Sequence, residues 1–190
     1  MEATTHIDSN EYITKIAPLI KEEMTKKREN YLHETSLLQD NSDETIEKLK
    51  NAFEIRQNKM KEGNVAQIMI GNIPGWEDLG VGHSSGLDCK KNDNSAIIEL
   101  KNKYNTCNSG SEKNIKDKLA TYKKNNPKTR CIWGIINPKK NNKKLSTKII
   151  HNGVEIEKIQ GIDLLKLVYN TNDEEVIYKI INDIKKIMYN

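Results

Sequence analysis

The stretch Gly86-Leu87-Asp88-Cys89-Lys90, followed after Asn92-Asp93-Asn94 by Ala96-Ile97-Ile98-Glu99-Leu100-Lys101, is typical of a β-hairpin. The second predicted strand is apolar until it ends abruptly in Glu99 and Lys101. Side chains alternate across a strand, so Glu99 and Lys101 point to one face and Leu100 to the other. A short hairpin brings Asp88 close to the Glu99 end, and this arrangement predicts a charged cluster on one sheet face.

This cluster of two carboxylates and one ammonium favours a metal-dependent reaction. Two carboxylates at close range repel each other, and a divalent cation with a preference for oxygen ligands removes the repulsion. Mg²⁺ suits such a site because it takes few carboxylates and keeps water ligands. A lysine beside the ion positions or deprotonates an attacking water and stabilises charge on a phosphate. The alternative is a surface salt bridge, since Glu-x-Lys is common on exposed strands.

The charge distribution points to a polyanion as the partner. The formal net charge is +4, but residues 1–80 carry 10 basic and 15 acidic side chains, whereas residues 81–190 carry 21 and 12. Between Lys101 and Lys148 there are 14 basic residues and only two acidic ones, Glu112 and Asp117. A segment of one sign attracts nucleic acid, although a lysine-rich solvated surface is about equally common.

The segments around the hairpin predict an α/β fold with a central mixed sheet. Upstream, we expect a helix capped near Asp8 and kinked at Pro18, and a second from Ser42 or Asp43 to near Gly63 with Ile46, Leu49 and Phe53 on one face. The run Val65 to Ile70 fits helix or strand, and Asn72 to Ser85 reads as a loop. Downstream we expect these elements: a helix capped by Ser109 or Ser111 and ending near Lys124, a strand over Cys131 to Ile136, a hairpin turning at Asn152-Gly153, and helices over Ile162 to Tyr169 and Asp173 to Met188.

Length and composition set the remaining bounds. A chain of 190 residues fits one domain, 1–190, with a mainly helical part over 1–70, a catalytic core over 84–137, and a hairpin and C-terminal helices over 138–190. No apolar run approaches a membrane span, no signal segment opens the chain, and no P-loop suggests a nucleotide cofactor. Three scattered cysteines, Cys89, Cys107 and Cys131, suit a reducing cytoplasm.

The motif Gly86-Leu87-Asp88, ten residues, then Glu99-Leu100-Lys101 resembles the PD-(D/E)xK nuclease superfamily. Leu87 stands where that superfamily usually has proline, a position that varies. The resemblance covers about residues 84–137, and its order of helix, hairpin, helix and strand implies a restriction-endonuclease-like core. It also implies that Asp88, Glu99 and the Leu100 carbonyl hold Mg²⁺ and that Lys101 activates the water.

The segment from Glu99 to Thr106 is similar to type II restriction endonucleases, in particular the branch that cuts GGNCC sites. This likeness implies sequence-specific cleavage of double-stranded DNA by a homodimer of a restriction-modification system, leaving 5′-phosphate and 3′-hydroxyl ends. Two alternatives stay open: a structure-specific nuclease of the same fold, such as a resolvase or nicking enzyme, and a DNA-binding module without catalysis.

Several further side chains are candidates for contact with DNA or the metal ion. The candidates for DNA contact are Lys103, Asn105, Ser109, Lys113, Lys116, the lysines between Lys139 and Lys144, and His83. For each of these, a solvated or structural side chain is the plain alternative. Glu54 on the second predicted helix is a candidate for an extra acidic group, although an exposed helix charge is the more common situation.

Overall fold

The computed structural model describes residues 7–26, 43–80, 82–105 and 107–189. The helices are α1 (Ser9–Thr25), α2 (Asp43–Gly71), α3 (Ser109–Asn125), α4 (Gly161–Tyr169) and α5 (Glu174–Tyr189). The strands are β1 (Trp76–Asp78), β2 (Cys89–Lys91), β3 (Ala96–Lys103), β4 (Arg130–Asn137), β5 (Ser146–His151) and β6 (Val154–Gln160).

The strands form one mixed sheet in the order β1-β2-β3-β4-β6-β5. The first three strands are antiparallel, β3, β4 and β6 run parallel, and β5 returns antiparallel along the edge of β6. The connection from β3 to the parallel β4 passes through α3, as a parallel crossover requires. The predicted α/β fold with a mixed central sheet is therefore confirmed.

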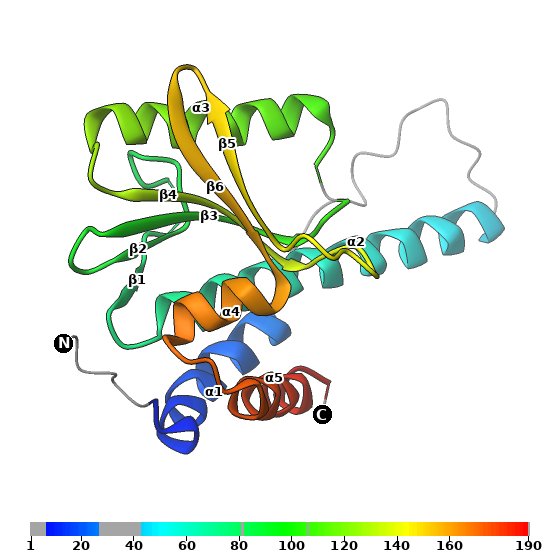
Figure 1. The fold of residues 1–190 in the computed structure, drawn as a ribbon. Coiled ribbons are helices and arrows are strands. Elements are labelled where there is room, and N and C mark those ends of the chain that lie inside the picture. Colours follow the sequence, from blue (N-terminus) through cyan, green and yellow to red (C-terminus); the bar gives the residue numbers. More distant parts are fainter. Residues whose placement is uncertain (1–6, 27–42, 81, 106, 190) are drawn as a thin grey trace.

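Helices cover both faces of the sheet (Figure 1), with α3 on one face and α1, α2, α4 and α5 on the other. Each face has its own apolar core, and neighbouring residues of β3 enter different cores. Ile97 packs in the core under α3, whereas Ile98 and Leu100 pack in the core under the four other helices. By the same alternation, Glu99 and Lys101 belong to the α3 face.

Two upstream predictions are wrong in their details. Gly63 does not end α2, which continues to Gly71, and the ambiguous run from Val65 to Ile70 is helical. Val65, Met69 and Ile70 are buried at helical spacing, and this burial outweighs the roughly 1 kcal/mol cost of a helical glycine. The predicted loop after α2 contains β1, because Trp76 is buried and its strand pairs with β2.

The ends of the other elements follow local sequence signals closely. Asp8 caps α1 by accepting from the backbone of Asn10 and Glu11, and Pro18 lies within that helix. The cap of α3 is Asn108, and not Ser109 or Ser111 as predicted, because the Asn108 side chain accepts from the Ser111 backbone N–H. The hairpin at Asn152-Gly153 is confirmed, with φ of 49° and 80° at these two residues.

The predicted apolar face of Ile46, Leu49 and Phe53 lies outside the described side chains. No helix in the described part of the chain has the length and apolarity that a membrane span requires.

Candidate active site

Asp88 lies directly before β2 and faces the end of β3. Its backbone N–H donates to the Ile98 carbonyl at 3.0 Å, and its Oδ2 accepts from the Leu100 backbone N–H at 2.6 Å. The pairing of β2 with β3 ends at Cys89, opposite Ile98, and Asp88 lies next to that last pair. The negative charge of Glu99 acts on the Asp88 carboxyl, so the two side chains lie close to each other. The hairpin therefore brings the two carboxylates together.

Glu99 is a buried carboxylate with only one of its two oxygens paired. The residue is 5% exposed, and its Oε1 accepts from Lys101 Nζ at 2.7 Å. Its Oε2 is buried and has no hydrogen-bond partner among the residues that the structure describes. A buried oxygen without a partner carries a desolvation cost of about 1–3 kcal/mol, and more when charged, so proteins rarely leave one without a reason. A cation ligated at this oxygen is such a reason.

The pKa of the Asp88 carboxyl is raised above its usual value, chiefly by burial and next by the negative charge of Glu99. The Leu100 N–H, Lys101 and Lys118 act in the opposite direction without cancelling the rise. Ionised Asp88 is therefore held at an energetic cost beside Glu99. A bound divalent cation reverses this balance because it favours both charged forms.

The donor set fits a hard cation that keeps part of its water shell. No cluster of three or more His, Cys, Asp or Glu side chains occurs in the described residues, so a closed cage of the zinc or calcium type is not formed there. Mg²⁺ is commonly bound by one or two carboxylates, with substrate phosphate and water completing the shell. Asp88 and Glu99, with the unpaired Oε2, meet that requirement.

A groove of about 360 Å³ gives access to this cluster. The wall on the strand side contains Asp88, Leu100, Lys101 and Asn102, and the other wall is formed by α2. The α2 residues on that wall are Lys59, Met60, Gly63, Asn64 and Gln67. Asp88 and Lys101 are thus open to a ligand at the end of β3, and Glu99 lies buried behind them.

Two side chains near the cluster were not singled out by sequence reasoning. Lys118 Nζ, from α3, donates to the Gly86 carbonyl at 2.9 Å and so fixes the backbone just before Asp88. Glu62, from α2, accepts from Asn102 Nδ2 at 2.9 Å and pairs with Lys103 at 3.2 Å. Both contacts join segments about 30 to 40 residues apart in sequence, and no local pattern predicts them.

The predicted DNA contacts lie outside the cluster itself. Lys103 is paired with Glu62, as described above, whereas Asn105 and Ser109 are exposed in the segment that leaves β3 and enters α3. On α3, Lys113 pairs with Asp117 at 2.8 Å, and Lys116 pairs with Glu112 at 2.6 Å. The lysines of the 139–144 loop are exposed: Lys139, Lys140, Lys143 and Lys144.

The two remaining candidates are also exposed. His83 lies in the loop before Asp88, with its Nδ1 at 2.8 Å from Ser85 Oγ. Glu54 is exposed on α2 and is not among the residues of the groove, whose α2 wall begins at Lys59. The acidic side chain of α2 that reaches β3 in the described structure is Glu62.

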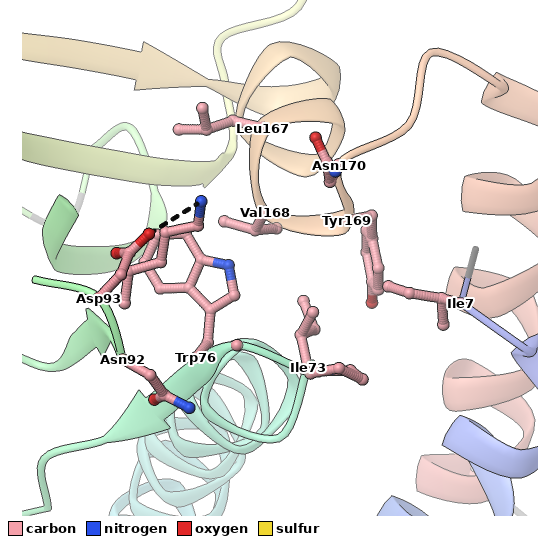
Figure 2. A pocket seen from close by; sticks show the side chains of 12 residues that line it. Ile7, Ile73, Trp76, Asn92, Asp93, Leu167, Val168, Tyr169 and Asn170 are labelled. Carbon is pink, nitrogen blue, oxygen red and sulfur yellow. Dashed lines mark ion pairs between the residues drawn. The ribbon is translucent and has the colours of Figure 1, made fainter. Parts of the chain in front are cut away.

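A second cavity, of about 370 Å³, lies beside the turn between β2 and β3 (Figure 2). Trp76, Ile73, Val168 and Tyr169 surround it with apolar surface. Its charged groups are Lys91 and Asp93, which pair at 3.9 Å. This cavity has one carboxylate and one ammonium, and it lacks the buried carboxylate with an unpaired oxygen that Glu99 adds beside Asp88 and Lys101.

Comparison with known proteins gives one family. No curated protein matches the sequence closely enough to count as a relative. The family model described as Eco47II restriction endonuclease matches residues 9–189, from the start of α1 to the end of α5. The match includes the hairpin, the groove and α3. The chain therefore belongs to the Eco47II restriction endonuclease family, and with it to the type II restriction endonucleases.

Proposed function

We propose that this chain is a Mg²⁺-dependent endonuclease that hydrolyses double-stranded DNA at a specific sequence, leaving 5′-phosphate and 3′-hydroxyl ends. The observation that carries the proposal is the buried, unpartnered Oε2 of Glu99 beside Asp88 and Lys101. Family membership supports cleavage of DNA, and the charge cluster supports the metal-dependent chemistry.

Asp88, Glu99 and the Leu100 carbonyl would hold the ion. When bound, Mg²⁺ supplies polarisation of the phosphate and of a water molecule, and it neutralises developing negative charge. Asp88 is set for this role by its hydrogen bond from the Leu100 N–H, which leaves Oδ1 as its second oxygen. Glu99 contributes Oε2 because its Oε1 is engaged with Lys101.

Lys101 acts on the reacting groups directly. Its side chain is 29% exposed and pairs with Glu99, and Lys101 is among the residues that line the groove. From this position it orients the attacking water and donates to the phosphate oxygen on which charge increases. Holding water and phosphate at one place supplies much of the rate enhancement, since a positioned reaction avoids a large entropic cost.

The proposal includes a homodimer and, for its target, the GGNCC class of sites. A palindromic sequence has a two-fold axis, and a two-fold dimer places one active site on each strand. The likeness of residues 99–106 to that branch supports the target, and family membership is compatible with it.

Digestion of a sequenced plasmid, with Mg²⁺ and with EDTA, tests the proposal. Discrete fragments with ends at one repeated sequence, formed only with Mg²⁺, are expected. Random nicking or cleavage confined to DNA junctions would favour a structure-specific nuclease. Binding without cleavage at any Mg²⁺ concentration would instead identify a non-catalytic DNA-binding protein.

A further inference from the structure

Among the described residues of α2 that line the groove, the one charged side chain is Lys59. We propose that Lys59 binds a phosphate of the DNA backbone next to the one that is cut, and so positions the strand across Asp88 and Lys101. This inference rests on the proposed nuclease function and identifies which part of the substrate the groove holds. It assigns a role to a helix that carries no residue of the predicted catalytic motif.

The helix face toward the groove has a regular spacing. Lys59, Gly63 and Gln67 are four residues apart and therefore lie one above the other on α2. A Cβ added at Gly63 meets no atom within 4 Å, so the glycine leaves open space in the middle of the wall. Glycine inside a helix costs about 1 kcal/mol relative to alanine, and the space beside Gly63 is available to a ligand in the groove.

The other polar groups of the groove are committed to contacts within the protein. Asn64 Nδ2 donates to Glu23 at 2.6 Å, and Gln67 Nε2 donates to Asp78 at 2.8 Å. Asn102 Nδ2 donates to Glu62 at 2.9 Å. These amides shape the walls of the groove, and each of them already donates one hydrogen bond within the protein.

Lys59 differs from these amides because it is exposed and makes no hydrogen bond or ion pair with the residues that the structure describes. Lys101 on the opposite wall is held by Glu99 at 2.7 Å. A strand that places one phosphate at Lys101 extends its neighbouring phosphates along the groove toward α2. A flexible lysine provides a point charge for such a phosphate without reading the base sequence.

The substitution Lys59→Gln tests this contact, and Lys128→Gln is its matched control. Lys128 is exposed in the turn between α3 and β4. Its substitution by glutamine removes the same charge at a place away from the groove. Affinity is measured in EDTA, as a function of salt, for a short duplex that contains the cleavage site mapped on the plasmid. For Lys59→Gln we expect binding roughly tenfold weaker at low salt. The negative slope of log K against log salt should become shallower by about 0.9, the contribution of one phosphate contact.

Neutral linkages in the DNA locate the phosphate concerned. Duplexes with one methylphosphonate, at the cut position or at either neighbour on the same strand, are compared between the wild-type chain and Lys59→Gln. The penalty of the substitution should disappear for one neighbouring linkage and persist for the others. An unchanged slope, an equal change in Lys128→Gln, or a penalty that persists with every linkage overturns the proposal.

The plasmid digest separates this result from failure of the proposed function. If the wild-type chain does not cut DNA, the salt slope is measured on a duplex of arbitrary sequence. A reduced slope for Lys59→Gln alone then supports the phosphate contact in a protein that only binds DNA. Equal slopes for both variants reject the contact whether or not cleavage occurs, and circular dichroism verifies that each variant is folded.

Discussion

The hairpin of β2 and β3 carries a lysine and a carboxylate two residues apart at each of its two ends. At the end of β3, Lys101 and Glu99 lie 2.7 Å apart, and the Glu99 side chain is 7% exposed. At the turn, Lys91 and Asp93 lie 3.9 Å apart, and the Asp93 side chain is 59% exposed. The two pairs have the same spacing in sequence, so their different environments must account for any difference in what they do.

Two aspartates show the contrast most directly. The pKa of Asp88 is raised by burial and by Glu99, whereas the pKa of Asp93 is lowered, chiefly by its hydrogen bonds from Ser95. Lys91 and Asp93 at the turn form a surface ion pair. Such a pair contributes about 0–1 kcal/mol to stability. The Lys101 end concentrates negative charge in a partly buried place. Negative charge held close together in a partly buried place is the property expected of a cation-binding site.

The largest effect is expected when a carboxylate of the Lys101 end is removed. Asp88→Ala and Glu99→Ala should each reduce plasmid cleavage to the level seen with EDTA, a loss of roughly 10⁴-fold or more, because ion and water lose their ligands. DNA binding should stay the same or become tighter, since fewer negative charges face the phosphate. Cleavage assays and gel-shift titrations measure the two quantities separately.

Asp93→Ala is the matched control at the other end of the hairpin. It removes the same side chain from the same two strands, and we expect cleavage within about twofold of wild type, as for most exposed substitutions. Near-native cleavage by Asp88→Ala or Glu99→Ala would show that the catalytic groups lie elsewhere.

The next largest effect is expected from the lysines. Lys101→Met should lower the rate of cleavage by about 10²- to 10⁴-fold, the usual contribution of a group that orients or transfers a proton. Lys91→Met should leave the rate unchanged because its ammonium pairs only with surface carboxylate in the described structure. Single-turnover kinetics on a mapped duplex measure the chemical step. Equal rates for the two variants would contradict the assignment of Lys101.

The comparison of the two ends also shows which parts of the site could be predicted from the sequence. Alternation along β3 places Glu99 and Lys101 on one face, and the Asn-rich turn brings Asp88 to them, so the cluster was predictable from local patterns. The spacing alone does not distinguish Lys101–Glu99 from Lys91–Asp93. The distinction follows from the apolar run before Glu99, which indicates burial of that end of the strand.

What the sequence did not predict depends on contacts between distant segments. Lys118 reaches Gly86, and Glu62 reaches Asn102, through packing of α3 and α2 against the sheet. The continuation of α2 past Gly63 and the presence of β1 likewise depend on burial, in the first case of Met69 and in the second of Trp76. Local propensities carry no information about such packing.

An intermediate effect is expected at Lys118, which supports the Asp88 end of the hairpin from α3. Lys118→Met removes the hydrogen bond to the Gly86 carbonyl and a positive charge near Asp88. We expect cleavage to fall by about 10- to 100-fold, as for groups that orient metal ligands, with a higher Mg²⁺ concentration needed for half-maximal rate. Lys124→Met, on the exposed end of α3, is the control. A rate loss without a change in Mg²⁺ dependence would indicate a purely structural role.

The smallest effect concerns the stability of the metal-free protein. Its sign is expected to differ between Asp88 at one end of the hairpin and Asp93 at the other. The folded-state pKa of Asp88 is raised, so the folded chain binds more protons than the unfolded chain above pH 3.8, and stability falls as pH rises through this window. Asp88→Asn should therefore stabilise the protein at neutral pH. For a chain of this size, about 1 kcal/mol corresponds to a rise in Tm of roughly 2–4 °C. The gain in stability from Asp88→Asn should disappear below pH 3.8, where Asp88 is protonated in both the folded and the unfolded chain.

Asp93 gives the reverse sign. Its folded-state pKa is lowered, so its contribution to stability is present above pH 3.8 and is lost as pH falls through the lower folded value. Asp93→Asn should lower Tm slightly at neutral pH, and added salt should reduce the difference because the carboxylate is exposed. Thermal unfolding in EDTA across this pH range measures both variants. If Asp88→Asn and Asp93→Asn changed Tm in the same direction at neutral pH, the carboxylate at the Lys101 end would not be held at a cost. Binding of a cation would then not relieve an energetic cost at that carboxylate.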